Sequence, residues 1–455
     1  MMKNISKNRV VVLFILFLNI FMLGSCEKFL AAKNDKDLAE PTTIVDLQAL
    51  IDYFARINNF SVGAGLLAGD EYYLSDADFK ALPTEQNRNM YLWNDNNVVE
   101  PGFNTWSFSF DRIYTANTVL EKLPNIAREK DNAEIWDNLK GQALLLRGKS
   151  FFEVAIVWSL AYDPMEAEKD LGLPLRLSTD FNERSVRSSL KATYAQIVND
   201  IKRSIDLLPT KPIHDFRGSE PAACALLARV YLSMREYDSC YRYSDLAMKL
   251  DGTLLDYNSL DTNKAYPFER FGPEVILDNG MLVSYSPLSR VDSVLFRMYA
   301  PGDLRKVLLF NPNADGSHSF GGTYGGSSSL FCGVATDEVY LMHAECLARK
   351  GEIQQALADL NTLLKLRYKT GTFSPLTTAD SDEALKWILA ERRKELLYRG
   401  LRWMDIKRLN KEGANIILKR IIDGKSIVLP PNDPRYALAI PDDVIDISGM
   451  PQNPR

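Results

Sequence analysis

Cysteine and histidine are scarce in this chain of 455 residues, which contains five cysteines and three histidines. Four cysteines lie in the body of the chain, at Cys224, Cys240, Cys332 and Cys346. Their spacing fits neither a zinc site nor a redox motif, and we expect buried free thiols rather than a disulfide, although the sequence leaves both open. The histidines have no metal-ligand spacing and lie near no nucleophile motif, so we expect no metal, no cofactor and no enzymatic activity.

The chain also lacks an excess of basic residues. Its formal net charge of −5 and pI near 5.5 argue against a nucleic-acid partner, because phosphate binding needs a basic face. Beyond the N-terminus, no apolar run is long enough to span a bilayer. The apolar content of 46% and the charged content of 25% are typical of a globular protein.

The N-terminus has the three parts of a lipoprotein signal peptide. A basic head at residues 3–9 precedes an apolar run at residues 10–23, which is shorter than the roughly 20 residues of a spanning helix. The run ends in Leu-Gly-Ser-Cys, with the cysteine at position 26. We therefore predict that residues 1–25 are removed and that acyl chains on Cys26 anchor the protein to a membrane. An ordinary signal peptide cleaved near Ser25 is the alternative.

After a lipidated tether at residues 26–43, we expect a single domain at residues 44–455 with an all-α fold. Eight segments carry apolar residues at i, i+3 and i+4 over helical lengths. They are Thr105–Leu123, Glu134–Leu160, Lys191–Leu208, Pro221–Met234, Tyr237–Leu250, Asp337–Arg349, Ile353–Tyr368 and Asp382–Arg399. Between about 251 and 335 this periodicity fails, and Gly, Pro, Ser and Asn accumulate. We predict a long, irregular, loop-rich insertion there that forms part of the ligand face.

Two of the helix pairs resemble each other in their spacing of small residues. Ala228 and Cys240 in one pair align with Ala344 and Ala356 in the other. Small residues at this spacing let two helices approach closely where they cross, as in tetratricopeptide repeats. We therefore expect tetratricopeptide-like helical pairs.

Several motifs, in order along the chain, resemble those of the SusD/RagB family of nutrient-binding lipoproteins. One is the helix around residues 144–152, followed by Gly-Leu-Pro-Leu at residues 172–175. The most specific is Glu-Arg-Arg-Lys-Glu-Leu at residues 391–396, followed by a Gly-x-Arg-x-x-Asp-x-x-Arg pattern at residues 400–408. The resemblance runs from the cysteine at position 26 to the C-terminus. It implies capture of a nutrient on the outer membrane, facing the cell surface, for a SusC-like TonB-dependent transporter.

The charged motif at residues 391–396 has a structural interpretation of its own. Glu391 and Glu395 lie one helical turn apart, with Arg392 and Lys394 on neighbouring faces. This spacing predicts a lattice of ion pairs that holds the last helices together. A pair of catalytic carboxylates is the alternative.

Candidate ligand-binding residues are aromatic and polar side chains outside the helical pattern. Exposed rings can stack on the C–H faces of a sugar, while amide and carboxylate groups bond to its hydroxyls. The candidates are Tyr72, Tyr73, Tyr91, Trp93, Asn94, Asp95 and, in the glycine-rich loop, Tyr324. The alternative is that these rings pack the N-terminal segments onto the helices.

These observations lead to one preferred function and two alternatives. The preferred function is the binding of oligosaccharide or glycan for a SusC-like transporter. The first alternative is a peptide or another non-glycan nutrient as ligand. The second is a structural tetratricopeptide-like scaffold of the envelope.

Overall fold

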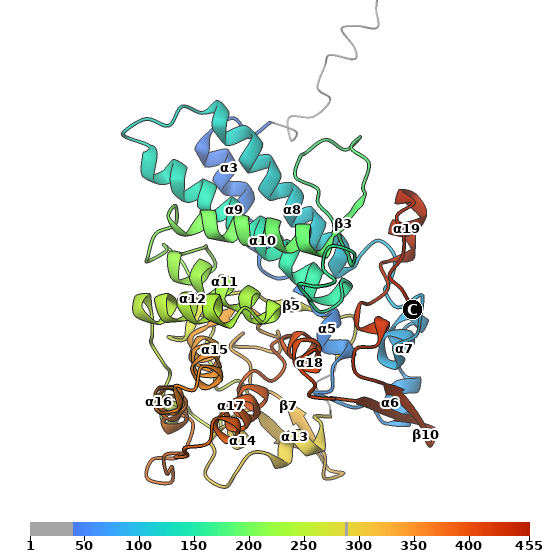
Figure 1. The fold of residues 1–455 in the computed structure, drawn as a ribbon, viewed down its shortest axis with the longest axis vertical. Helices are drawn as coiled ribbons and strands as arrows, with labels where there is room; N and C mark the ends of the chain where they lie inside the picture. Colours follow the sequence, from blue (N-terminus) through green and yellow to red (C-terminus); the bar gives the residue numbers. More distant parts are fainter. Residues whose placement is uncertain (1–39, 287–289) are drawn as a thin grey trace, which may run out of the picture. The chain divides into compact units, whose positions relative to one another are not determined.

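The computed structural model describes residues 40–286 and 290–455, so the predicted lipidation at Cys26 lies outside the described residues. Residues 44–455 form one compact unit. The described residues that precede it, 40–43, contain no helix or strand. Helices dominate the larger unit (Figure 1), which confirms the predicted all-α class. No helix in the described part of the chain has the length and apolar character needed to cross a membrane.

Eight long helices carry the fold, and each corresponds to a helix predicted from the sequence. They are α8 (Thr105–Lys122), α9 (Ala133–Trp158), α10 (Leu190–Ile205), α11 (Glu220–Met234), α12 (Tyr237–Leu250), α15 (Thr336–Arg349), α16 (Ile353–Lys365) and α17 (Ser381–Glu395). The largest difference is at the end of α17, which was expected to reach Arg399. The helix stops earlier because Tyr398 adopts a left-handed backbone conformation with φ of 59°.

Local signals explain where several of these helices begin. Ser189, Ser219 and Asp380 are the N-cap residues of α10, α11 and α17, and each side chain accepts a hydrogen bond from a backbone N–H of the first turn. Such a bond satisfies one of the donors that a helix start leaves unpaired. The caps therefore define helix starts that the apolar periodicity alone places only approximately.

The long helices stack in sequence order. Each of α8 to α12 packs against the next, α12 packs against α15, and α15 contacts both α16 and α17. Figure 1 shows this succession from α8 near the top to α17 below. Ala228, Cys240, Ala344 and Ala356 are all fully buried, as the predicted pairing of α11 with α12 and of α15 with α16 requires. The four cysteines in the body of the chain are free thiols, and three of them are buried.

Short elements connect and cover the helical stack. The other helices are α3 (Ile44–Ile51), α4 (Phe54–Ile57), α5 (Ala64–Ala68), α6 (Asp76–Lys80), α7 (Glu85–Leu92), α13 (Ser293–Arg297), α14 (Arg305–Leu308), α18 (Arg402–Asn410) and α19 (Asp442–Ser448). The strands are β1 (Ser61–Val62), β2 (Leu171–Pro174), β3 (Arg187–Ser189), β4 (Val275–Leu277), β5 (Met281–Leu282), β6 (Phe310–Pro312), β7 (His318–Phe320), β8 (Val334–Ala335), β9 (Leu418–Ile422) and β10 (Lys425–Leu429). Each strand belongs to a two-stranded sheet.

One of these small sheets joins segments that are far apart in the sequence. Strand β1 pairs in parallel with β5, so that Ser61 lies opposite Met281 and Val62 opposite Leu282. The pairing brings the middle of the loop-rich region against α5 and α7 of the N-terminal segment. The candidate site described below lies at this junction.

Candidate functional site

Three of the predicted ligand-binding rings are buried. Tyr72, Tyr91 and Trp93 are each about 1% exposed, so the expectation that these rings are exposed is wrong, and their role in ligand binding stays a prediction. The guanidinium of Arg420, on β9, lies 5.1, 4.3 and 5.1 Å from their respective ring centroids. Arg420 also donates a hydrogen bond of 2.7 Å to the carbonyl of Tyr72. The rings thus enclose a cation of the protein itself, in a cation–π arrangement.

The polar candidates beside these rings lie at the surface. Asn94 and Asp95 are exposed, because α7 ends at Trp93 in a left-handed conformation and the chain turns outward. Tyr73 is half-buried, and its backbone N–H donates to the carbonyl of Arg290. None of these three residues is among those that line the cavities described here. Their role in ligand binding stays a prediction.

Tyr324, the candidate from the glycine-rich loop, borders a cavity of about 280 Å³ but is itself only 8% exposed. Its hydroxyl lies 2.5 Å from a carboxylate oxygen of Glu274 and 2.8 Å from the hydroxyl of Tyr257. The other oxygen of Glu274 accepts a hydrogen bond from Arg367 at 2.7 Å. Burial raises the pKa of Glu274. Because these polar groups already bond to one another, they offer a ligand little.

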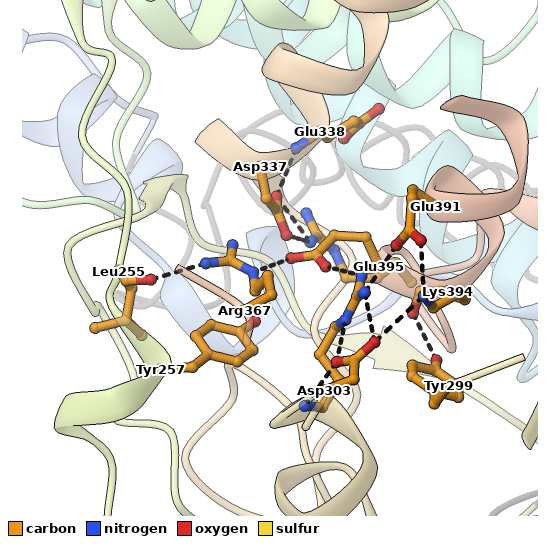
Figure 2. Close-up of polar contacts among 12 residues, drawn as sticks. Leu255, Tyr257, Tyr299, Asp303, Asp337, Glu338, Arg367, Glu391, Lys394 and Glu395 are labelled. Atoms are coloured by element: carbon orange, nitrogen blue, oxygen red, sulfur yellow. Dashed lines mark hydrogen bonds and ion pairs between the residues drawn. The ribbon is translucent and has the colours of Figure 1, made fainter. Parts of the chain in front are cut away.

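The charged motif of α17 forms the predicted lattice of ion pairs, which Figure 2 shows in part. Glu395 accepts hydrogen bonds from Arg305 at 2.7 Å and from Arg367 at 2.6 Å. Arg305 also bonds to Glu391, and Lys394 bonds to the same carboxylate, each at 2.7 Å. Because the two glutamates are paired with cations inside the protein, we interpret the lattice as structural and not as a pair of catalytic carboxylates.

The lattice extends through the rest of the C-terminal motif. Arg392 and Arg408 both donate to Asp405, at 2.9 and 2.8 Å. Arg408 also forms a two-pronged ion pair with Glu345 on α15, at 2.6 and 2.8 Å. These bonds tie α17 and α18 to the helical stack. Arg305 and Arg367, which complete the lattice, belong to no recognised motif and were missed in the sequence.

A cavity of about 270 Å³ lies where the N-terminal segment meets β5, and we call it the Asn87 cavity. It is lined by Ala64, Leu67, Asn87, Met90, Val98, Val99, Glu100, Phe103, Asn104, Thr105, Leu282, Val283 and Ser284. Two N-caps shape its walls. The Thr84 side chain caps α7 by accepting from the N–H of Asn87, and the Asn104 side chain caps α8 by accepting from that of Ser107.

Asn87 lines the cavity and carries a buried hydrogen-bond acceptor that no described residue uses. The residue is 2% exposed, and its Nδ2 donates to the hydroxyl of Ser284 at 2.9 Å. Its Oδ1 has no hydrogen-bond partner in the part of the chain that the structure describes. A buried acceptor without a partner costs about 1–3 kcal/mol, so a donor that enters the cavity gains a favourable bond.

An exposed aromatic ring stands at the rim of the Asn87 cavity. Phe103 is 70% exposed and packs edge-on against Phe108 at 4.6 Å, and Phe108 stacks on Phe60, also at 4.6 Å. The preceding Gly102 turns the chain with a φ of 73°, and its N–H donates to Asp443 on α19. The ring is therefore held in place while its outer face stays open. An open ring, an amide and the carboxylate of Glu100 thus meet at one cavity.

Two family models match different parts of this chain. A model described as "Starch-binding associating with outer membrane" matches residues 28–232, and one described as "SusD family" matches residues 336–426. The chain belongs to the SusD/RagB family. The family is one of binding proteins, which confirms the prediction that the chain is not an enzyme, and its description associates it with the outer membrane.

One known protein and two solved structures illustrate what this chain is similar to. SusD-like protein P38 of Formosa agariphila is 22% identical, over 90% of this chain and 92% of its own length. A SusD superfamily protein from Bacteroides thetaiotaomicron has a TM-score of 0.72 at 22% identity, covering 91% of this chain and all of its own. A putative sugar binding protein from Bacteroides vulgatus also has a TM-score of 0.72, at 21% identity, covering 91% and 99%. At this identity the structures confirm the fold.

Proposed function

We propose that this protein captures an oligosaccharide in the Asn87 cavity and delivers it to a SusC-like TonB-dependent transporter. The observation that carries the proposal is the unpaired Oδ1 of Asn87 beneath the exposed ring of Phe103. A sugar offers both partners, since its hydroxyls donate hydrogen bonds and its C–H face stacks on an aromatic ring. The starch-binding description of the family and the sugar-binding name of one similar structure support the same ligand class.

In the proposed complex, a sugar ring lies against Phe103 and directs one hydroxyl to Asn87. Glu100 accepts from a second hydroxyl. Among the described residues only one of its oxygens has a side-chain hydrogen-bond partner, the hydroxyl of Thr84 at 2.9 Å. The apolar lining by Leu67, Met90 and Val98 contacts the carbon-bound hydrogens. Ligand sites commonly combine an apolar wall with a few convergent polar groups in this way.

The anchoring and delivery steps belong to the same proposal. Acyl chains on Cys26 would hold the protein at the outer membrane, facing the cell surface, and the polar tether would leave the domain free to move over a transporter. The helical pairs would supply the face that rests on the transporter. The association of the family with the outer membrane supports this arrangement.

Isothermal titration of the detergent-solubilised protein against a panel of oligosaccharides tests the proposed function. We expect a binder at millimolar concentration or below, and a loss of about tenfold in affinity or more for Phe103→Ala and for Asn87→Leu. Phe103 is exposed, so its truncation leaves the fold intact and separates binding from stability. Tyr53→Ala is the matched control, because Tyr53 is 58% exposed but lies outside the cavity lining.

The same titration distinguishes the alternatives. Binding of a peptide panel and of no oligosaccharide would contradict the glycan assignment. Capture of a β-barrel transporter without measurable affinity for any small ligand would favour a structural scaffold instead. Oligosaccharide binding that is insensitive to both cavity variants would show that the site lies elsewhere.

A further inference from the structure

A second cavity, which we call the aromatic groove, lies beside the Asn87 cavity and has a volume of about 350 Å³. It is lined by Trp106, Phe110, Ile113, Tyr114, Asn117, Pro174, Arg176, Ser178, Thr179, Phe181, Ser185, Val444, Ile447, Ser448 and Met450. These residues come from α8, from the end of β2 and its connection to β3, and from α19 and the residues just after it. The proposed function assigns no role to this groove.

Two stacked rings form the outer wall of the groove. Tyr114 on α8 and Phe181 in the β2–β3 connection stack with centroids 5.0 Å apart and planes inclined by 28°. Phe181 is 79% exposed and Tyr114 38%. Deeper in, Trp106 and Phe110 pack together, also at 5.0 Å. Exposed rings of this kind leave faces open for a flat apolar partner.

Several hydrogen bonds hold the β2–β3 connection, which carries Phe181, in place. Asn117 on α8 donates to the carbonyls of Arg176 and Ser178, at 3.0 and 3.3 Å. The N–H of Thr179 donates to Glu121 at 2.9 Å, and the Arg176 guanidinium bonds back to carbonyls within the same connection. These bonds fix the backbone on either side of the exposed ring.

Consecutive residues of α8 line the Asn87 cavity and the groove. Thr105 lines the Asn87 cavity, and the next residue, Trp106, lines the groove. The bond from Gly102 N–H to Asp443, at 2.9 Å, joins the rim of the first cavity to α19, which forms a wall of the second. Phe103 follows Gly102 directly, so the rim of the Asn87 cavity lies close to α19. A chain-like ligand that leaves the Asn87 cavity past Phe103 therefore meets the groove.

We infer that the aromatic groove is a second subsite for the same glycan, which takes further sugar residues of an extended neutral oligosaccharide. The inference rests on the proposed function of the Asn87 cavity. Each cavity alone is at the small end of the sites that hold drug-sized ligands, so a longer chain gains contacts by occupying both. Thr179, Ser185 and Ser448 add polar groups to the lining, which suits a sugar better than the apolar centre of a protein interface would. Their hydroxyls also bond within the protein, to Glu121, to Arg176 and to the carbonyl of Val444.

Titration with oligosaccharides of different length tests the inference. The probes are maltose against maltooctaose, and laminaribiose against laminarihexaose, on the detergent-solubilised protein. We expect the longer member of the binding series to have about tenfold higher affinity or more, because it adds contacts without a second binding event. Phe181→Ala and the double variant Tyr114→Ala/Phe181→Ala should remove this gain and leave the affinity for the short member unchanged. Ile213→Ala, at a site that is 85% exposed and lines neither cavity, should leave both unchanged.

The outcomes separate the inference from the proposed function. Equal affinity for short and long members, or a length gain that survives the double variant, would overturn the second subsite while the Asn87 cavity stands. If no member of either series binds, the proposed function and the inference fail together for these glycans. If Phe181→Ala abolishes capture of a protein partner and leaves every glycan affinity unchanged, the groove is a protein-docking surface and the inference is wrong.

Discussion

Glu71 is a buried carboxyl whose ionisation should limit stability at high pH. Its Oε1 accepts a hydrogen bond of 2.9 Å from the N–H of Tyr398, while its Oε2 has no partner among the described residues. Burial is the largest cause that raises its pKa, from 4.5 to about 8. The folded protein thus binds this proton more tightly than the unfolded chain does. The resulting stabilisation is complete below pH 4.5 and is lost as the pH rises through about 8.

Glu71→Gln should therefore change the pH dependence of stability. The amide oxygen can still accept from Tyr398, and the side chain no longer ionises. We expect melting temperatures close to the wild type at about pH 5 and several degrees higher at about pH 8.5, since about 1 kcal/mol shifts a large domain by roughly 2–4 °C. Thermal unfolding of both proteins across this range is the measurement. Parallel curves for the two proteins would contradict the raised pKa.

The candidate ligand-binding residues show which features of single side chains can be recognised from the sequence. Aromatic residues between 72 and 93 were recognisable as unusual, but their partner Arg420 follows more than 300 positions later and belongs to no motif. Nothing local distinguishes rings that enclose an arginine from rings that await a ligand. Asn87 was missed because its place in the cavity depends on distant residues. Its Nδ2 donates to Ser284, and the pairing of β1 with β5 brings the two segments together.

At the level of elements, the eight long helices were predictable because their signals are local. Apolar residues at helical spacing and N-caps such as Ser189 and Ser219 act within one or two turns. The short elements between residues 251 and 335 lack such signals. Their positions depend on contacts across the chain, as between β4 and β8.

The α17 lattice allows a test of how the last helices are held. The side chain of Glu395 is fully buried between Arg305 and Arg367. Glu395→Gln should cost about 3–5 kcal/mol of unfolding free energy, because two buried guanidinium groups lose their shared carboxylate. Chemical denaturation provides the measurement. Asp137→Asn is the matched control, since its ion pair with Arg128 is half-exposed and should contribute almost nothing. Equal losses in the two variants would show that the lattice has no special role.

For the molecule as a whole, we expect a folded binding domain that a lipidated tether joins to the membrane. Replacing Cys26 by Ala would remove the proposed acyl chains, and with them the burial of about 0.8 kcal/mol per methylene that would anchor the protein. We expect the variant to appear in the soluble fraction, to bind the same oligosaccharide, and to fail to support uptake. Fractionation followed by titration of the released protein is the measurement. A variant that remains with the membranes would contradict lipid anchoring at this residue.

Locating a bound oligosaccharide by crystallography tests the central claim most directly. The experiment is a structure of the protein with the tightest binder from the glycan panel. The account predicts a sugar ring against Phe103, with one hydroxyl within hydrogen-bonding distance of Asn87 Oδ1. An oligosaccharide found only in the cavity beside Tyr324, or at a surface away from α7 and β5, would contradict it.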